Sequence, residues 1–412
     1  MYLTVGQYGN HLSRPNVTVT MSPLADTKFP ALGLYDGTVA KYSQFRDLTA
    51  NPKVIVDLCL VKNPGFESGL LGWKRFGGDV VADTAQFYTG AKSCRVPGSP
   101  NQVYQDAIAI SGERLRLGWA TRGHVSGGST AMALQDNLTG KWLQSDFTWG
   151  ASIYLHGSNA TTAWAPGSAT FTVEAFSSTL RHLTSLRISG RGAGSNGGWI
   201  DDITLVPATN WCSVHGVGIT ANLVPTLYSD DDSAFGSATL QATLTPQPLT
   251  FGASITSFLE RYLKFQLTGT PKFKPWIGEL VLAQAREIPS ARYESELSYE
   301  FPAPNAKANR LTALKTTVIP QRKLKLKFRY ATDAAWELAR ELFVDRCRGD
   351  GETVIVGIDS LDTGLVMLGG FQGPRGHAKI EPAVRDGFDV VIVEDPFPRV
   401  PVPAPGPPTG AG

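Results

Sequence analysis

The stretch NPGFESGLLGW, Asn63 to Trp73, has the composition of a domain start, although strand-like sequence precedes it. A turn-forming Asn-Pro-Gly leads to an acidic residue behind a Phe, and then to Gly-Trp. A matching end is GGWIDDITLVP, Gly197 to Pro207. Between the two stretches, apolar and polar residues alternate as in half-buried strands near 115–123, 130–137, 168–176 and 183–190. We therefore expect a self-contained β-sandwich over 61–207.

The composition limits the class of protein. The 412 residues include 38 Lys and Arg against 36 Asp and Glu, without a long block of either sign, which disfavours a nucleic-acid partner. The chain is too long for one core, and its 43 Gly, 27 Pro and short alternating segments predict two or three mainly β domains. No secretory leader or membrane-length apolar run is visible, so we expect a protein made in a cytosol without membrane insertion.

The cysteines carry no metal or redox motif, because no Cys-x-x-Cys spacing occurs. We expect reduced, partly buried thiols. Cys59 and Cys212 flank the 61–207 block, and a disulfide between them is compatible with the sequence but not required. The four cysteines are Cys59, Cys94, Cys212 and Cys347.

The paired ends of the block resemble the terminal signatures of jelly-roll carbohydrate-binding modules attached to xylanases and related glycanases. This resemblance implies a β-sandwich with a glycan-binding face and a structural calcium. Carried onto this chain, the calcium ligands are Glu67 and Asp201, with Asn63 or Asp202 as helpers, and hard oxygen ligands suit that ion. The alternative is that Asp201 accepts backbone N–H groups and Glu67 is solvated.

Strand alternation supplies a separate argument about Asp201. Its parity places it on the same face as Trp199, Ile203 and Leu205, so its carboxylate needs a cation or several donors. The neighbouring Asp202 is expected on the opposite face of the strand, so the two carboxyls cannot flank a scissile bond.

Sugar binding requires exposed aromatic rings, because the C–H face of a pyranose stacks on them while planar polar side chains meet its hydroxyls. The loop-rich region 138–166 holds the best aromatic candidates, and two polar residues lie near it in the predicted strands. The alternative for each ring is packing in the core. The candidates are Trp142, Trp149, Tyr154 and Trp164, with Gln135 and Arg122.

The flanks of the block explain the strand-like sequence before Asn63. Residues 16–45 and 53–58 resemble the first half of a discoidin-like, or galactose-binding-like, sandwich, and 211–283 resembles its second half. One sandwich is therefore expected in a loop of another, whose halves are 1–60 and 208–285. Such an insertion costs little free energy when the ends of the inserted domain lie close together.

The C-terminal part differs in character. We expect an α+β or barrel domain over 286–398, with one helix in AAWELARELFVDRC, 334–347, whose apolar residues form one stripe. In QRKLKLKF, 321–328, alternating lysines blunt an edge strand or meet an acidic subunit. The Pro- and Gly-rich 399–412 is expected to be an extended tail.

The order of these parts resembles tail-tip and baseplate structural proteins of tailed bacteriophages. It implies a virion tail protein assembled in the host cytoplasm, whose partners are other tail proteins, ring-forming copies of itself and host-surface polysaccharide. One alternative is a non-catalytic carbohydrate-binding region of a secreted glycan-active enzyme, and another is a purely architectural subunit. The histidines are isolated and no nucleophile has a base at a recognisable spacing, so we predict no enzyme.

Overall fold

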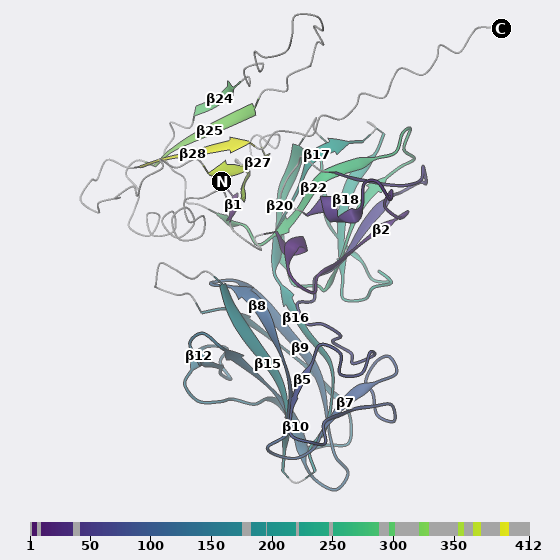
Figure 1. Ribbon diagram of the computed structural model, residues 1–412, viewed down its shortest axis with the longest axis vertical. Helices are drawn as coiled ribbons and strands as arrows, with labels where there is room; N and C mark the ends of the chain where they lie inside the picture. Colours follow the sequence, from purple (N-terminus) through teal and green to yellow (C-terminus); the bar gives the residue numbers. More distant parts are fainter. Residues whose placement is uncertain are drawn as a thin grey trace, which may run out of the picture.

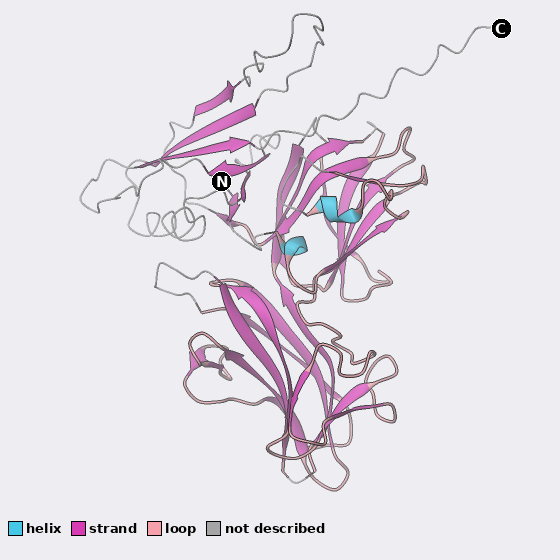
Figure 2. Ribbon diagram, in the orientation of Figure 1, coloured by secondary structure: helices cyan, strands magenta, loops and turns pink. Residues whose placement is uncertain are grey.

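The computed structural model describes residues 2–5, 10–35, 42–174, 183–194, 196–219, 222–246 and 250–287, and five further strands between 296 and 394. Nearly all of the described chain is β, which confirms the predicted fold class (Figure 2). The described helical elements are two 3-10 turns, η1 (His11–Ser13) and η2 (Ala31–Leu34). The predicted helix at 334–347 and the tail at 399–412 lie outside the described residues. Within the described residues, no helix has the length and apolar character needed to cross a bilayer.

Two antiparallel sheets, ordered β20-β17-β22-β3 and β19-β18-β21-β4-β2, form the host sandwich. Their strands are β2 (Thr18–Ser22), β3 (Ser43–Gln44), β4 (Lys53–Asp57), β17 (Thr209–Gly218), β18 (Val224–Asp230), β19 (Thr239–Thr243), β20 (Thr250–Phe258), β21 (Tyr262–Thr268) and β22 (Trp276–Ala283). Strand β4 pairs with β21 from Asp57 opposite Tyr262 to Lys53 opposite Gln266. Strands from before and after the long block thus share one sheet and one core.

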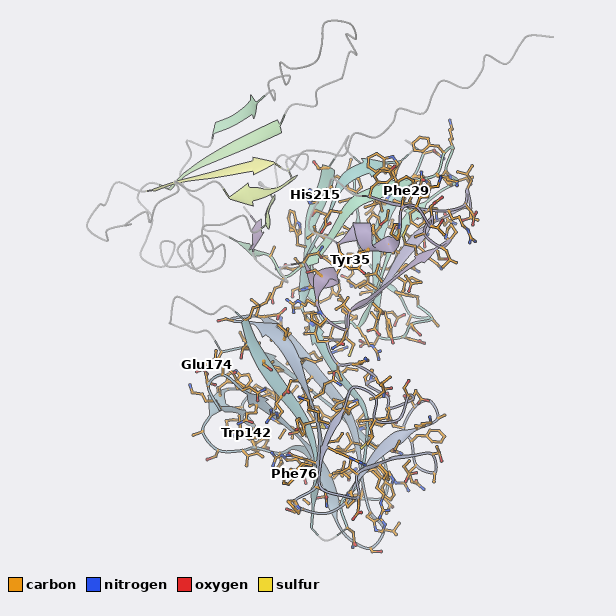
Figure 3. All side chains as sticks on the ribbon, viewed as in Figure 1. Phe29, Tyr35, Phe76, Trp142, Glu174 and His215 are labelled. Carbon is orange, nitrogen blue, oxygen red and sulfur yellow. The ribbon has the colours of Figure 1, made fainter. Side chains whose placement is uncertain are left out.

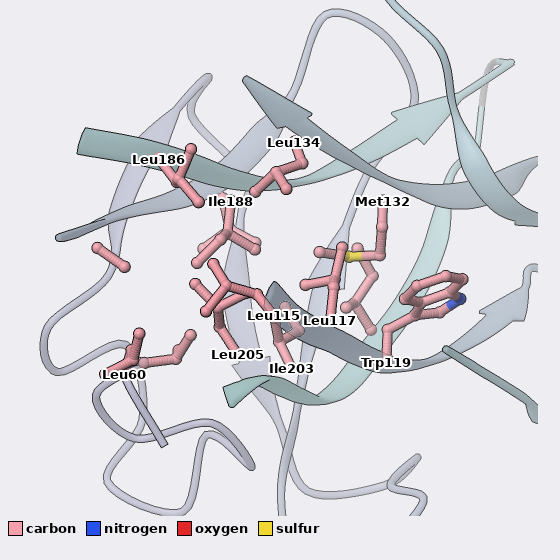
Figure 4. Packing of buried hydrophobic residues seen from close by; sticks show 14 of the residues in the cluster. Leu60, Leu115, Leu117, Trp119, Met132, Leu134, Leu186, Ile188, Ile203 and Leu205 are labelled. Carbon is pink, nitrogen blue, oxygen red and sulfur yellow. The ribbon is translucent and has the colours of Figure 1, made fainter. Parts of the chain in front are cut away.

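The block between them forms the inserted sandwich, with sheets ordered β12-β11-β10-β15-β8-β5 and β14-β9-β16-β7-β6. The first sheet consists of β5 (Lys74–Phe76), β8 (Gln102–Ile110), β10 (Ser129–Asp136), β11 (Trp142–Leu143), β12 (Trp149–Gly150) and β15 (Leu183–Ala193), and β13 (His156–Asn159) also pairs with β10. The second consists of β6 (Val81–Asp83), β7 (Ser93–Val96), β9 (Arg114–Gly123), β14 (Ala165–Thr172) and β16 (Gly198–Pro207). Alternate residues of both sheets, such as Leu117, Met132 and Ile188, fill the core between them (Figure 4).

A β-bulge in β16 overturns the parity expected for Asp201. The register of β16 against β9 shifts between Asp201 and Thr204, and Asp202 has a φ of 48°, in the left-handed region. The extra residue places Ile203 and Leu205 on the core side together with Ile200, whereas Asp201 pairs with Ala120 on the other side of the sheet. Asp201 is nevertheless fully buried there, against the loop before β7. The expectation that Asp201 shares a face with Ile203 and Leu205 is therefore wrong, because simple alternation does not hold across the bulge.

The two sandwiches lie end to end, and β16 runs into β17 across Ala208 (Figure 1). Val17 packs against both cores, and Asn16 Nδ2 donates to Leu60 O at 3.0 Å. At the same joint, His11 Nε2 lies 3.0 Å from Ala208 O. The joint is therefore a packed interface in addition to two chain connections.

The third sheet, ordered β23-β1-β26-β27-β28-β25-β24, corrects two expectations. Its strands are β1 (Tyr2–Val5), β23 (Arg286–Glu287), β24 (Glu296–Glu300), β25 (Gln321–Phe328), β26 (Thr353–Gly357), β27 (Val366–Phe371) and β28 (Phe388–Glu394). Strand β1 pairs with β26 and β23, so the start of 1–60 joins this sheet and not the host sandwich. Strand β25 pairs with β24 and β28 on its two sides and is not an edge strand.

Candidate functional site

The sheet of β8, β10 and β15 has one face toward the core and one face away from it. Val103, Leu134 and Ile188 belong to the core, so the residues of opposite parity point away from it. We call this second surface the open face. It comprises Lys74, Phe76, Gln102, Tyr104, Asp106, Gln135, Trp142, Arg187, Ser189 and Arg191.

Strand pairing fixes the arrangement of the open face. One line across the sheet runs from Trp142 through Gln135 and Arg187 to Asp106. Tyr104 lies on the neighbouring line, opposite Ser189. Because β10 and β15 separate the strands of Trp142 and Tyr104, the two aromatic positions are at least about 14 Å apart, which is three strand spacings.

A third aromatic ring, Phe76, extends the open face at its β5 edge. Its side chain is 55% exposed, and it is paired with Gln102 of β8. Gln102 Oε1 is buried and has no hydrogen-bond partner within the part of the chain that the structure describes. Figure 3 places Phe76 and Trp142 in the inserted sandwich, on the ribbon below the host sandwich.

Asp106 is the carboxylate of the open face, and it is fully engaged. It accepts from Arg187 Nε at 3.1 Å, from Asn137 Nδ2 at 3.0 Å and from Lys74 Nζ at 3.3 Å. Burial opposes its charge, but the hydrogen bonds from Asn137 and Arg187 together with the ion pair hold the pKa of Asp106 below its usual value. Asp106 therefore remains ionised and forms ion pairs with Arg187 and Lys74.

Two guanidinium groups lie against the aromatic rings. Arg187 Cζ is 4.9 Å from the Tyr104 ring centroid, and Arg191 Cζ is 5.2 Å from that of Trp142. Arg191 Nε also lies 3.5 Å from Ser189 Oγ. The open face thus combines aromatic rings, amides and cations, which is the chemistry that contacts both faces and hydroxyls of a sugar.

The sequence-predicted glycan residues do not all reach this face. Trp142 and Gln135 lie on it as direct cross-strand neighbours. Trp149 Nε1 donates to Thr172 O at 2.9 Å, and its ring packs edge-on against Phe171 of the core. Trp149 is therefore a packing residue.

The other candidates lie elsewhere on the inserted sandwich. Tyr154 packs against His156 at 4.8 Å between ring centroids, and Trp164 lies 5.9 Å from Tyr88. Arg122 belongs to the second sheet, where its Cζ is 5.7 Å from the Trp199 ring. Arg122 therefore lies on the sheet opposite the one that carries Trp142.

Sequence reasoning missed Tyr104, Arg187 and Arg191. Their signal was present in the sequence, where polar or aromatic residues recur at every second position over 102–106 and 185–191. Only the pairing of β8 with β15 shows that these residues share a face with Trp142.

Three of the four predicted calcium residues, Glu67, Asp201 and Asp202, accept hydrogen bonds from the loop before β7. Asp201 Oδ2 accepts the N–H groups of Tyr88 and Thr89 at 2.8 and 3.3 Å. Glu67 Oε1 accepts those of Ala91 and Lys92 at 2.8 and 3.2 Å. Asp201 thus accepts backbone N–H groups, as the alternative to calcium binding predicts. Glu67, which that alternative expects to be solvated, binds the loop instead.

Asp202 and Asn63 complete this picture. Asp202 Oδ2 accepts from Thr89 Oγ1 at 2.7 Å, so both aspartates contact the same residue, which corrects their expected separation onto opposite faces. Asn63 Nδ2 donates to Gly69 O at 2.8 Å, closing its own turn. Among the described residues, no three His, Cys, Asp or Glu side chains gather as a metal site, so calcium stays a prediction.

The charge state of Asp201 reflects this environment. Burial, followed by repulsion from Asp202, raises the pKa of Asp201 to about 7, although backbone N–H groups oppose the shift. A bound cation would favour the ionised form.

One further polar cluster lies in the host sandwich. Ser213 Oγ and His215 Nε2 are 2.9 Å apart, and Trp211 Nε1 lies 3.1 Å from the same hydroxyl. Both Ser213 and His215 are fully buried, so a substrate cannot reach the hydroxyl. The cluster is a hydrogen-bond network of the sheet and not a nucleophile–base pair in a cleft.

Comparison with known proteins gives likenesses of structure only. No known protein family and no curated protein matches the sequence. A family 16 carbohydrate-binding module is similar at 22% identity, over 36% of this chain and 99% of its own, with a TM-score of 0.28. TmCBM61, solved with β-1,4-galactotriose, is similar at 17% identity over 36% and 98%, with a TM-score of 0.26.

A phage protein is also among the similar structures. The enzymatically active domain of bacteriophage CBA120 tailspike protein 4 matches at 12% identity, over 36% of this chain and 21% of its own, with a TM-score of 0.26. At these identities and TM-scores the three likenesses say nothing about ligands or partners of this chain.

Proposed function

We propose that the open face binds a glycan, which makes the inserted sandwich a non-catalytic carbohydrate-binding module. The observation that carries the proposal is the placement of Trp142 and Tyr104, both half-buried, on the sheet surface that points away from the core, between polar side chains. Aromatic rings take the apolar C–H face of a pyranose, and planar amides and guanidinium groups take its hydroxyls.

The open face also places polar side chains side by side. Gln102 pairs with Arg191 in the sheet, so an amide and a guanidinium are cross-strand neighbours within the open face. The distance between the aromatic positions suits an oligosaccharide, since one sugar ring cannot touch both.

A glycan array with the full chain tests this function. We expect retention of at least one polysaccharide class when the protein is presented at high valency, because weak single-site contacts then add. Absence of binding to every glycan at high valency would favour a purely architectural sandwich.

For the whole chain we propose a structural role in the virion of a tailed phage, at the tail tip or baseplate. Its support is the sequence resemblance of the three-part order, and a ring of copies would repeat the open face at fixed spacing. Electron microscopy of the purified protein, alone and with tails, tests this role. Closed rings or decorated tails support it, and isolated single copies favour an accessory region of a secreted glycan-active enzyme.

A further inference from the structure

The open face has an excess of positive charge. Lys74, Arg187 and Arg191 are three cations, and Asp106 is one carboxylate, so the set sums to 3 − 1 = +2. The whole chain, by comparison, is close to neutral at +2 over 412 residues. The charge of the face is thus concentrated and not a reflection of the overall composition.

The single carboxylate neutralises one side of the face only. Asp106 is held by Arg187 and Lys74, at 3.1 and 3.3 Å. Arg191 lies four residues further along β15, and its polar contact is with the Ser189 hydroxyl. Among the described residues, Arg191 forms no ion pair with a carboxylate.

Arg191 is also partly removed from water. Its guanidinium lies against the Trp142 ring, and burial lowers the pKa of Arg191. Drawing a cation out of water without an anion beside it is unfavourable, and a ligand anion relieves that cost. Gln102 is the cross-strand neighbour of Arg191 and does not neutralise its charge.

We propose that the ligand of the open face is an anionic glycan, whose carboxylate or sulfate is bound by Arg191 while the adjoining sugar ring stacks on Trp142. This inference rests on the proposed glycan-binding function and specifies its ligand class. Guanidinium offers two parallel N–H donors to such an anion, a geometry that neither Lys74 nor an amide reproduces.

Calorimetric titration of the full chain with matched pairs of polymers tests the proposal. Polygalacturonate and dextran sulfate are the anionic members, and methyl-esterified polygalacturonate and dextran are their neutral partners. We expect one anionic member to bind about tenfold more tightly than its partner, and the difference to shrink between low and high salt.

The chain offers a closely matched control for the arginine. Arg191→Gln should remove most of the preference for the anionic member, and Arg191→Lys should restore part of it. Arg122→Gln removes the same charge from a guanidinium that also stacks on an indole, on the other sheet, and should change nothing. Thermal unfolding of each variant separates lost binding from lost structure, and the salt dependence of the unmodified protein stands independently of any variant.

The outcomes separate the two proposals. Binding of neutral and anionic polymers with equal affinity, or an unchanged preference in Arg191→Gln, overturns the anionic class and leaves glycan binding in place. Failure to bind any of these polymers, together with a blank glycan array, overturns both.

Discussion

Arg14 and Glu113 form a two-pronged ion pair across the joint between the sandwiches, with 1% and 3% of their side chains exposed. Arg14 Nη2 lies 2.7 Å from Glu113 Oε1, and Nη1 donates to Oε2 at 3.0 Å. Glu113 Oε2 also accepts Ile110 N–H at 3.1 Å, so the carboxylate is fixed in the inserted sandwich. A second link joins Arg116 of the inserted sandwich to Asp231 of the host. Two ion pairs, one of them buried, therefore cross the joint.

Breaking the buried pair should destabilise the protein strongly. Glu113→Gln leaves Arg14 as an uncompensated buried charge, and we expect a loss of about 3–5 kcal/mol in the free energy of unfolding. The pair Arg14→Met and Glu113→Leu should recover most of it, because both charges are then removed. Denaturant unfolding measures each variant.

An exposed ion pair supplies the control for this experiment. Arg46 and Asp47 keep 53% and 47% of their side chains exposed, so Arg46→Gln should cost less than about 1 kcal/mol. If Glu113→Gln costs no more than Arg46→Gln, the ion pair does not hold the joint.

Two tryptophans predicted together from the sequence should now behave differently. Trp142→Ala removes a ring from the open face and should weaken glycan binding about tenfold, with little loss of stability. Trp149→Ala removes a ring packed against Phe171 and should lower the free energy of unfolding by roughly 2 kcal/mol or more. Titration and denaturant unfolding of both variants check the contrast. Equal loss of glycan affinity in both would contradict the assignment.

Strand-scale features could be read from the sequence because they depend on local alternation. The segments near 115–123 and 183–190 became β9 and β15, with bounds of Arg114–Gly123 and Leu183–Ala193. The mainly β class followed from the same alternation together with Gly and Pro content. Each of these inferences needs only neighbours in the chain.

Features that depend on which strands pair, and in which register, could not be predicted from local alternation of apolar and polar residues. One inserted residue at Asp202 reversed the face of Asp201, and local alternation carries no mark of such a bulge. Strand β1 pairs with β26, more than three hundred residues away, and with β23 on its other side, and local alternation specifies neither partner. The open face likewise required the register that sets Tyr104 beside Ser189.

His11 should make the joint sensitive to acid. Burial, and secondly the nearby Arg14, holds the pKa of His11 well below its usual 6.5, so the ring is neutral in the folded protein. Below pH 6.5 the unfolded chain takes up a proton that the folded state does not, so the free energy of unfolding falls as pH falls, by at most about 1.4 kcal/mol per unit. Denaturant unfolding of Asp201→Asn at pH 5 and 7, in which the opposing titration of that carboxylate is removed, should show this loss, and adding His11→Gln should reduce it. An equal loss in the variant would assign the acid sensitivity elsewhere.

The titration of Asp201 should change the free energy of unfolding with pH in the direction opposite to that of His11. Its pKa rises to about 7 in the folded protein from the usual 3.8, chiefly through burial. Between about pH 4 and 7 the folded state therefore holds a proton that the unfolded chain has released. The free energy of unfolding should fall as pH rises through this window, by at most about 1.4 kcal/mol per unit, when a chelator is present.

Calcium should reverse that slope if the ion binds at Asp201, because a cation replaces the proton and its binding strengthens as the carboxylate ionises. Denaturant unfolding of His11→Gln from pH 5 to 8, with chelator or with calcium, isolates Asp201 from the opposing histidine. Asp201→Asn keeps an oxygen that can accept the Tyr88 N–H and should abolish both the slope and the calcium response. An identical unfolding profile with and without calcium would remove Asp201 and Glu67 from any metal site and leave them as the carboxylates that fasten the loop before β7.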